Sequence, residues 1–549
     1  MTTLLTLHDP AAARTYYAKG LWRQDTLYSL VRDHAAARPD AFALRDARRR
    51  LTWRDLLRWI DVTADALHEA GVRKGQRVSV WLPNSTEAVV AFVACSRNGY
   101  VCNPSLHRNY TVAEIVGLVK RLRSAALFVE PGYGADADRH DIVAATRELS
   151  FLKRVFLRGS DFPPADGPAR NLVEPDLNPD KICYLAFTSG TTGEPKGVMH
   201  SDNTLLANGR PMVEDWSHGP DTVLYSLSPL SHHIGTVAVE QALVAGAELV
   251  VDDLPAGTTR YDRIVETGAT YVMGVPTHAM DILGEMRRRG TDSLGNVSVF
   301  YMAGAPIPPE TAQGFLKRGI TPQNIYGMTE NGSHQYTLPS DGAQTIVETC
   351  GRACSGYEIR IWDAENPDTE VPQGTVGEIG GRGACLMLGY FDNQQATEDS
   401  YNARGWFMSG DLGRIDENGC LQIMGRKKDL IIRGGHNIHP TRIEDLALKH
   451  PAVAKAAAFA VADERLGEKV CLAVLLHEDE ALAGDDALAH LDAVGLSKFD
   501  MPEYYLVMEA FPLTASGKIM KRVLVDWTRE GRIAPQPVRW QPNKQRETA

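Results

Sequence analysis

Apolar residues follow two alternating patterns along the first quarter of the chain. After Thr52, leucine, isoleucine and alanine recur at the spacing of a helix that stops at Gly71. Short apolar runs follow at 77–82 and 125–129, with a helical pattern at 87–98 between them. Strands that alternate with helices in this way are typical of a mainly parallel sheet covered by helices. The sequence therefore predicts an α/β fold.

The tail of the chain shows a different pattern. A helix begins at Thr441, and two apolar, strand-like runs follow at 456–461 and 470–476. This compact mixture predicts a small α+β domain. We place the boundary in the basic run just before it, which gives an N-terminal domain at 1–427 and a C-terminal domain at 428–549.

The length and composition of the chain indicate how many domains it has and which general class of protein it belongs to. A chain of 549 residues is longer than one core normally supports, and its 44% hydrophobic and 23% charged residues are typical of a globular protein. The net charge of −11 offers no basic surface for a nucleic acid. The eight cysteines lack the paired spacing of a zinc site, and we find no signal peptide and no membrane-spanning run. We therefore expect a cytoplasmic protein.

The most specific stretch is an apolar run at 184–187 that breaks into a loop of threonine, serine and glycine and closes on Lys196. Glycines let successive backbone N–H groups point into one concavity, which binds anions. Lys196 follows Pro195 and precedes Gly197, so the loop is not a Walker A motif. We expect it to bind phosphate through Thr188, Ser189, Gly190, Thr191, Thr192, Gly193 and Lys196.

This segment resembles the phosphate loop of the adenylate-forming acyl- and aryl-CoA synthetases, a superfamily that includes peptide-synthetase adenylation domains and luciferases. The resemblance implies a large N-terminal AMP-binding domain of helix-covered, mainly parallel sheets and a small α+β C-terminal lid domain. It implies ATP, Mg²⁺ and coenzyme A as the cofactors and co-substrates. Lys428 matches the position of the hinge about which the family's lid domain rotates.

Three further motifs resemble the family's nucleotide site. The stretch after Met302 and the Tyr-Gly-Met-Thr-Glu motif at 326–330 match the segments that enclose adenine and contact the α-phosphate. The stretch at 406–413 matches the ribose-binding motif, in which Asp411 suits the ribose hydroxyls, and Arg426 stands where relatives reach the ribose or a phosphate. A carboxylate beside a triphosphate requires a divalent cation between them, which predicts Glu330 as the Mg²⁺ ligand. With the loop, the predicted ATP contacts are Gly304, Ala305, Pro306, Tyr326, Gly327, Met328, Thr329, Asp411, Arg426 and Lys518.

The resemblance also implies the catalytic residues. Lys518 matches the family's adenylation lysine, and the predicted catalytic set is Lys518, Thr329, Glu330, Lys196 and His232. A double glycine followed by His436 matches the loop at the pantetheine tunnel, so Gly434, Gly435 and His436 are predicted to bind CoA. His436 stands where an acidic residue is common, so its role is open. The implied reaction forms an acyl adenylate from ATP and then a thioester with CoA.

The segment around His232 resembles the family's acyl pocket, in which the matching side chain moves aside to admit CoA. His233 stands where amino-acid-activating relatives carry aspartate and hydroxybenzoate-activating relatives carry asparagine, which argues against an amino acid and against a 2-hydroxybenzoate. The predicted pocket contains His232, His233, Val237, Ala303, Gly327 and Asn331. Apart from the predicted metal ligand Glu330, the candidate pocket strings at 232–238, 302–305 and 327–332 have no acidic, lysine or arginine side chain, which favours a neutral, compact and largely apolar acid.

The whole chain looks most like bacterial ligases for alicyclic and aromatic acids, above all cyclohexanecarboxylate-CoA ligases. Benzoate-type and medium-chain fatty acids are alternatives, as are an enzyme that loads a carrier protein, a non-catalytic nucleotide sensor and a luciferase-like oxidase. Lys518 also resembles the site at which bacterial acetyltransferases silence such enzymes, so an acetyltransferase and a deacetylase are candidate partners. The sequence leaves the oligomeric state open.

Overall fold

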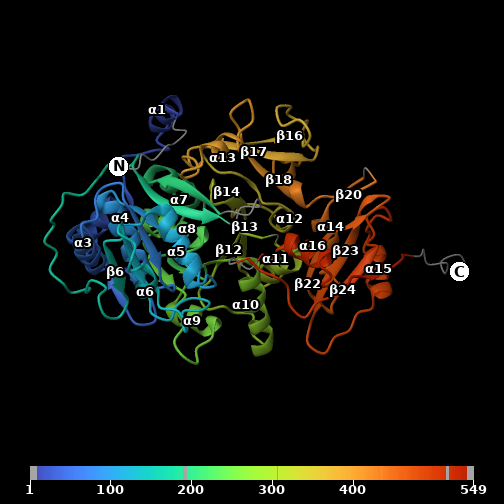
Figure 1. Cartoon of the computed structure of the whole chain (residues 1–549), viewed down its shortest axis with the longest axis horizontal. Helices are drawn as coiled ribbons and strands as arrows, with labels where there is room; N and C mark the ends of the chain where they lie inside the picture. Colours follow the sequence, from blue (N-terminus) through green and yellow to red (C-terminus); the bar gives the residue numbers. More distant parts are fainter. Residues whose placement is uncertain (1–8, 189–194, 306, 435, 515–517, 541–549) are drawn as a thin grey trace, which may run out of the picture. The chain divides into compact units, whose positions relative to one another are not determined.

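The computed structural model describes residues 9–188, 195–305, 307–434, 436–514 and 518–540 (Figure 1). Its contacts divide the chain into two compact units, which consist of Met1–Ile359 with Gly381–Phe407 and of Arg360–Gly380 with Met408–Ala549. Seven predicted site residues lie outside the described residues: Ser189, Gly190, Thr191, Thr192, Gly193, Pro306 and Gly435.

Two sheets form the frame of the first unit. The larger has the order β15 (Arg352–Ala353), β14 (Gly332–Tyr336), β13 (Thr321–Met328), β12 (Val299–Met302), β11 (Tyr271–Gly274), β9 (Val223–Ser226), β10 (Glu248–Val251), β1 (Phe42–Arg45) and β2 (Arg50–Thr52). The smaller has the order β6 (Arg154–Leu157), β5 (Ala126–Val129), β3 (Arg77–Trp81), β4 (Val101–Asn103), β7 (Ile182–Thr188) and β8 (Lys196–Ser201). Most strand pairs are parallel, and β7 with β8 is an antiparallel hairpin.

The helices of the first unit are α1 (Pro10–Ala18), α2 (Leu27–Ala37), α3 (Trp53–Glu69), α4 (Thr86–Asn98), α5 (Val112–Leu122), α6 (Ile142–Thr146), α7 (Asp202–Asp215), α8 (His233–Ala245), α9 (Arg260–Thr267), α10 (Pro276–Arg289), α11 (Pro309–Leu316), α12 (Ala343–Glu348) and α13 (Gln394–Glu398). Helices α2, α3, α4, α7 and α8 pack on one another, α4 and α7 contact the smaller sheet, and α3, α7 and α8 contact the larger one. The prediction of helix-covered, mainly parallel sheets is confirmed.

Local signals explain where α3 begins and ends. The Thr52 hydroxyl accepts a bond from the Asp55 backbone N–H, and the Asp55 carboxylate accepts one from the Thr52 N–H, so two otherwise unpaired donors of the first turn are satisfied. The helix ends at Glu69, two residues before Gly71, whose φ of +86° is a left-handed conformation that favours glycine.

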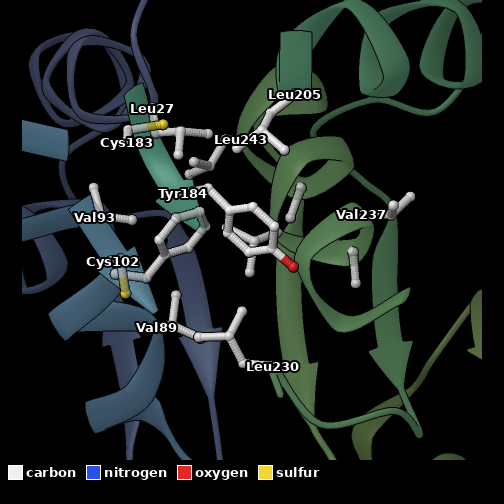
Figure 2. Close-up of a cluster of buried hydrophobic side chains, with 14 of the residues drawn as sticks. Leu27, Val89, Val93, Cys102, Cys183, Tyr184, Leu205, Leu230, Val237 and Leu243 are labelled. Carbon is white, nitrogen blue, oxygen red and sulfur yellow. The ribbon is translucent and has the colours of Figure 1, made fainter. Parts of the chain in front are cut away.

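Tyr184 of β7 lies at the centre of the largest buried cluster. Figure 2 shows its ring between Val93 of α4 and Val237 of α8, with the hydroxyl on the side of Val237. All three side chains are fully buried. The apolar start of the predicted phosphate segment is therefore anchored in the core, which fixes the point at which the loop leaves the sheet.

The second unit contains the tail of the chain. A four-stranded sheet consists of β16 (Tyr357–Trp362), β17 (Gly377–Gly383), β18 (Phe407–Ile415) and β19 (Leu421–Arg426). A six-stranded sheet follows, with the order β21 (His436–Ile438), β20 (Ile431–Arg433), β23 (Gly467–Leu476), β24 (Tyr504–Val507) and β25 (Gln536–Pro537), and with β22 (Val453–Asp463) paired to β23.

The remaining elements of this unit are a 3-10 turn, η1 (Lys427–Asp429), and the helices α14 (Pro440–Ala447), α15 (Gly484–Ala493) and α16 (Lys521–Arg529). The prediction of a small α+β domain is confirmed, and the predicted strands at 456–461 and 470–476 lie within β22 and β23. A hinge at Lys428 stays a prediction. Among the described residues, no helix combines the length and the apolar character needed to cross a membrane.

Candidate active site

The β7–β8 hairpin holds both ends of the predicted phosphate loop. Thr188, the last residue of β7, pairs with Lys196, the first residue of β8. The Arg121 guanidinium of α5 donates to the Pro195 carbonyl oxygen at 2.6 Å and fixes the return of the loop. Thr188 and Lys196 are thereby placed opposite each other at the mouth of the loop.

Tyr390 connects two residues that the sequence predicts for phosphate and metal binding. The Lys196 ammonium lies 4.9 Å from the centre of the Tyr390 ring, within the range of a cation–π contact. The Tyr390 hydroxyl donates to Glu330 Oε1 at 3.0 Å. Burial, followed by the charge of Glu330, raises the pKa of Tyr390 well above its ordinary value, so its hydroxyl stays protonated and acts as a donor.

Glu330 lies in a tight turn between β13 and β14. A Cβ atom on Gly327 would lie 1.8 Å from the Gly332 carbonyl oxygen, so only glycine fits there. The Asn331 side chain accepts from the Met328 N–H at 3.1 Å and donates to the Tyr357 hydroxyl at 3.1 Å. Asn331 thus closes the turn, and its predicted contact with the acid stays a prediction.

The buried side chain of His200 contacts the turn between β13 and β14. His200 of β8 lies 2.7 Å from the Thr329 carbonyl oxygen through Nε2 and 3.0 Å from Thr204 Oγ1 through Nδ1. A carbonyl oxygen only accepts, so Nε2 carries the proton and Nδ1 is the acceptor. Burial lowers the pKa of His200 to about 4, which keeps the ring neutral in this arrangement.

The two histidines predicted for the acid pocket have different surroundings. His232 stands at the N-terminal end of α8, and its ring lies 4.7 Å from the ring of His107, whose pKa burial lowers to about 3. His233 Nδ1 lies 3.1 Å from the Tyr184 hydroxyl, and its ring stacks on His200 at 5.6 Å. Burial, and then the neighbouring His200, lowers the pKa of His233 to about 3, so this side of the predicted pocket is uncharged.

The other predicted residues of the first unit lie at the ends of neighbouring strands. Ala303, Gly304 and Ala305 follow β12, while Tyr326, Gly327 and Met328 form the end of β13, which pairs with β12. Gly304 has a φ of +91°, and Ile234 and Val275 lie next to it. The carboxyl ends of parallel strands are where open α/β sheets bind ligands, so this edge is a suitable place for adenine.

In the second unit, Asp411 and Arg426 lie directly opposite each other on β18 and β19. Their side chains form an ion pair with 3.2 Å between Arg426 Nε and Asp411 Oδ1. Lys427 pairs with Glu378 at 2.8 Å. Burial, followed by the charge of Arg426, lowers the pKa of Lys428 from its ordinary value. An ionised carboxylate accepts hydrogen bonds, and the predicted contact of Asp411 with the ribose hydroxyls stays a prediction.

The predicted CoA-binding residues and the predicted adenylation lysine also belong to the second unit. Gly434 follows β20 with a φ of +57°, and His436 Nε2 lies 2.9 Å from Asp500 Oδ1. Lys518 is exposed, its N–H donates to Thr514 Oγ1 at 3.0 Å, and its carbonyl accepts from the Thr514 N–H at 2.7 Å. The lysine is therefore held to Thr514 by two backbone contacts while it is exposed, and His436 has the carboxylate of Asp500 as its neighbour.

Two family models match the chain. The model of the AMP-binding enzymes covers residues 31–391, and that of the AMP-binding enzyme C-terminal domain covers residues 442–518. The chain belongs to the AMP-binding enzyme family. It is an enzyme of the class of acyl-CoA synthetases and related AMP-forming ligases, as the motifs in its sequence imply.

Relatives of the family match over nearly the whole chain. A medium-chain fatty-acid–CoA ligase of Escherichia coli (strain K12) is 29% identical over 95% of this chain and 94% of its own. A 2-hydroxy-7-methoxy-5-methyl-1-naphthoate–CoA ligase of Streptomyces carzinostaticus is 30% identical over 94% and 95%. The crystal structure of ATP-bound MatB from Rhodopseudomonas palustris has a TM-score of 0.82 and 28% identity and covers 92% of this chain and 99% of MatB.

Sequence reasoning missed the residues that support the predicted site. Tyr390, His200 and His107 touch Glu330, Thr329 and His232 or their backbones, yet none lies in a motif that we singled out. Tyr390 follows the short apolar run at 384–388, and an aromatic residue there is indistinguishable from a core residue in the sequence alone. A bridge between Val198 and Tyr390, flanked by backbone hydrogen bonds from 388–391 to β8, brings it to the phosphate hairpin.

Proposed function

We propose that this enzyme is an ATP-dependent carboxylic acid–CoA ligase that acts through an acyl adenylate on a compact, largely apolar acid such as cyclohexanecarboxylate. The observation that carries the proposal is the connection from Lys196 through the buried Tyr390 to Glu330 at the mouth of the phosphate loop. This connection places a lysine ammonium near a carboxylate that can bind a metal ion. A bound triphosphate requires both a cationic side chain and a metal ion for charge neutralisation. Relatives that act on medium-chain and aryl acids support it.

The first step is attack of the acid's carboxylate on the α-phosphorus of ATP. Both reactants are anions, so the protein contributes positioning and charge neutralisation. Lys518 neutralises the carboxylate and the α-phosphate, Lys196 and the loop amides hold the leaving pyrophosphate, and Thr329 orients the reacting oxygens. Asp411, with Arg426, holds the ribose.

The residues present fit a bound Mg²⁺. Glu330 is buried and oriented by the Tyr390 hydroxyl, and a carboxylate oxygen can bind a metal while it accepts a hydrogen bond. When bound, Mg²⁺ neutralises phosphate charge. Among the described residues no group of three or more histidine, cysteine, aspartate and glutamate side chains could hold a metal ion, and Glu330 is the one protein ligand that we propose.

The second step is attack of the CoA thiol on the acyl adenylate, which releases AMP. It needs a thiol where the lysine stood, and rotation of the C-terminal domain about Lys428 exchanges Lys518 for the loop at Gly434, Gly435 and His436. His232 moves away from His107 to open the path for the thiol.

Release of AMP tests the function directly. The enzyme is incubated with ATP, Mg²⁺ and a series of cyclic, aromatic and linear acids, with and without CoA. We expect AMP release that depends on CoA and is fastest with a ring acid. Faster turnover of benzoate or of a medium-chain fatty acid would select those alternatives, and pyrophosphate exchange without CoA turnover would indicate an enzyme that loads a carrier protein. The absence of both AMP release and pyrophosphate exchange with every acid would contradict the ligase proposal.

Regulation by acetylation also belongs to this proposal. The Lys518 side chain is exposed, so an acetyltransferase could reach it, and acetylation would remove the charge used in the first step. Mass spectrometry after treatment with a bacterial acetyltransferase and acetyl-CoA should find acetyl-Lys518 and a matching loss of adenylation. An unmodified Lys518 would contradict this proposal. A cytoplasmic location stays an expectation.

A further inference from the structure

Helix α8 contains a carboxyl group that the proposed reaction does not use. Glu240 is fully buried, and neither carboxyl oxygen has a hydrogen-bond partner among the described residues. Burial raises its pKa well above the ordinary value of a glutamate, so the side chain is a neutral carboxyl that can both donate and accept. Buried polar groups nearly always form hydrogen bonds in folded proteins, so we expect this carboxyl to have a hydrogen-bond partner.

Helical spacing places Glu240 on the same face of α8 as the predicted acid pocket. Residues four and three positions apart are neighbours along one face, so His233, Val237 and Glu240 form a stripe. Thr236, four positions before Glu240, donates to the Tyr184 hydroxyl at 3.4 Å, and His233 lies 3.1 Å from that hydroxyl. The stripe therefore continues from the predicted pocket residues to the carboxyl.

Helix α7 and strand β14 bring further polar groups to the same place. A Cβ atom on Gly209 would lie 3.0 Å from Glu240 Cβ, so α7 passes very close to the glutamate. The neighbouring Asn208 accepts from the Ser333 N–H at 3.1 Å, and its Nδ2 is buried without a partner among the described residues. The Ser333 hydroxyl lies 2.7 Å from the Tyr301 hydroxyl.

Tyr301 and Ser333 are also close in sequence to residues that we predict for the acid pocket. Tyr301 lies two residues before Ala303, and Ser333 lies two residues after Asn331. Burial raises the pKa of Tyr301, so its hydroxyl stays protonated beside the Ser333 hydroxyl. Elements α7, α8, β12 and β14 thus converge on one polar region directly beyond the predicted acid-binding residues.

We propose that Glu240 and Asn208 form a hydrogen-bonding end to the acid pocket and that the acid carries a hydroxyl group on the part of its ring farthest from the carboxylate. The proposal rests on the proposed ligase function. A hydroxyl can donate to the Glu240 carboxyl oxygen and accept from the Asn208 amide, so it satisfies both unpaired groups. An ammonium group would require an ionised Glu240, which burial disfavours.

The test compares pairs of acids that differ by one hydroxyl: benzoate with meta- and para-hydroxybenzoate, and cyclohexanecarboxylate with its analogue hydroxylated at the ring carbon opposite the carboxylate. We expect the wild-type kcat/KM to favour the hydroxylated member by about tenfold or more, because a site built for a hydroxyl rejects the analogue that lacks it. Glu240→Leu should reverse the preference, and Glu240→Gln should keep part of it because an amide still forms hydrogen bonds.

Gln241→Leu is the matched control. Gln241 is the next residue of α8, is equally buried, and contacts Met273 and Tyr271 instead. It should leave the ratio of the two acids unchanged. A ratio that is also unchanged in Glu240→Leu, or in Glu240→Gln should the leucine variant not fold, would overturn the assignment of Glu240. Loss of AMP release with every acid in the wild-type enzyme would overturn the ligase function itself.

Discussion

Lys518 is the residue on which the proposed first step depends most. Its replacement by methionine keeps the length of the side chain and removes the charge. We expect ATP-dependent adenylation to fall by about 10²–10³-fold, the range seen when one donor to a developing anion is lost. Thioester formation from a presynthesised acyl adenylate and CoA should stay within about threefold, because the lysine serves the first step only. Separate assays of the two half-reactions measure both values.

Lys521 offers the control for this variant. It lies three residues from Lys518, and its ammonium pairs with Glu444 at 2.6 Å. Lys521→Met removes the same charge from the same unit, and it should lower stability while both half-reactions stay near the wild-type rates. Equal losses in the two half-reactions of the Lys518→Met enzyme would contradict a role confined to adenylation.

The buried carboxyl of Glu240 makes stability depend on pH. In the unfolded chain it releases its proton near the ordinary value of 4.5, whereas burial raises the pKa in the folded protein. The folded state therefore binds more protons above that pH, and its stability falls as pH rises. We expect Glu240→Gln to be more stable than the wild type, by a margin that is small near pH 4.5 and grows by up to about 1.4 kcal/mol per pH unit until the folded carboxyl ionises.

Urea unfolding at a mildly acidic and at a neutral pH measures this margin. Glu174→Gln is the control, since Glu174 is exposed and its neutralisation should change stability little at either pH. A Glu240→Gln margin that is the same at both pH values would show that Glu240 does not hold a proton in the folded enzyme.

At the scale of elements, the β18–β19 pair presents the predicted ribose contacts. Asp411→Asn removes the charge while it keeps the shape, and we expect the KM for ATP to rise by about tenfold, equivalent to about 1.4 kcal/mol. The KM values for the acid and for CoA should stay within about twofold. Lys427→Gln breaks the neighbouring ion pair with Glu378 and should leave all three values near those of the wild type. A uniform rise in all three KM values of Asp411→Asn would indicate a folding defect in place of a lost ribose contact.

Elements with strong local signals were predictable from the sequence. The capping pair Thr52 and Asp55, the apolar period after it and the glycine at 71 define α3 within a few residues, and the runs at 77–82 and 125–129 correspond to β3 and β5. The phosphate loop was recognisable because its residues are contiguous. Tyr390 was not, because its partner Glu330 lies 60 residues away and only the folded sheet joins them.

Glu240 illustrates a second kind of limit. It is the only charged type of residue in the mostly apolar helix α8, and a glutamate in a helix is normally expected at the surface. Its burial follows from the packing of α7 on α8 at Gly209, a contact between distant segments. The prediction of a largely apolar acid rested on pocket strings of which the first ended at Ala238, two residues before Glu240.

At the scale of the whole molecule, the proposal requires the C-terminal domain to rotate between the two steps. Lys428 lies in the middle of the turn η1, directly after β19, where a change of backbone dihedrals would redirect everything that follows. Lys428→Pro restricts φ to about −65° and removes an N–H. We expect pyrophosphate exchange to stay within about threefold and CoA thioester formation to fall about 100-fold, because only the second step needs the rotation.

Lys428→Ala separates backbone freedom from side-chain chemistry. It removes the exposed ammonium, yet it leaves the backbone free to rotate, so both half-reactions should continue. Loss of thioester formation in the alanine variant would assign a chemical role to the Lys428 side chain. Equal activity of the proline variant in both steps would place the hinge elsewhere, and the neighbouring Arg426 and Asp429 positions would be the next to receive proline. The pair of variants therefore decides whether the two half-reactions are coupled through this turn.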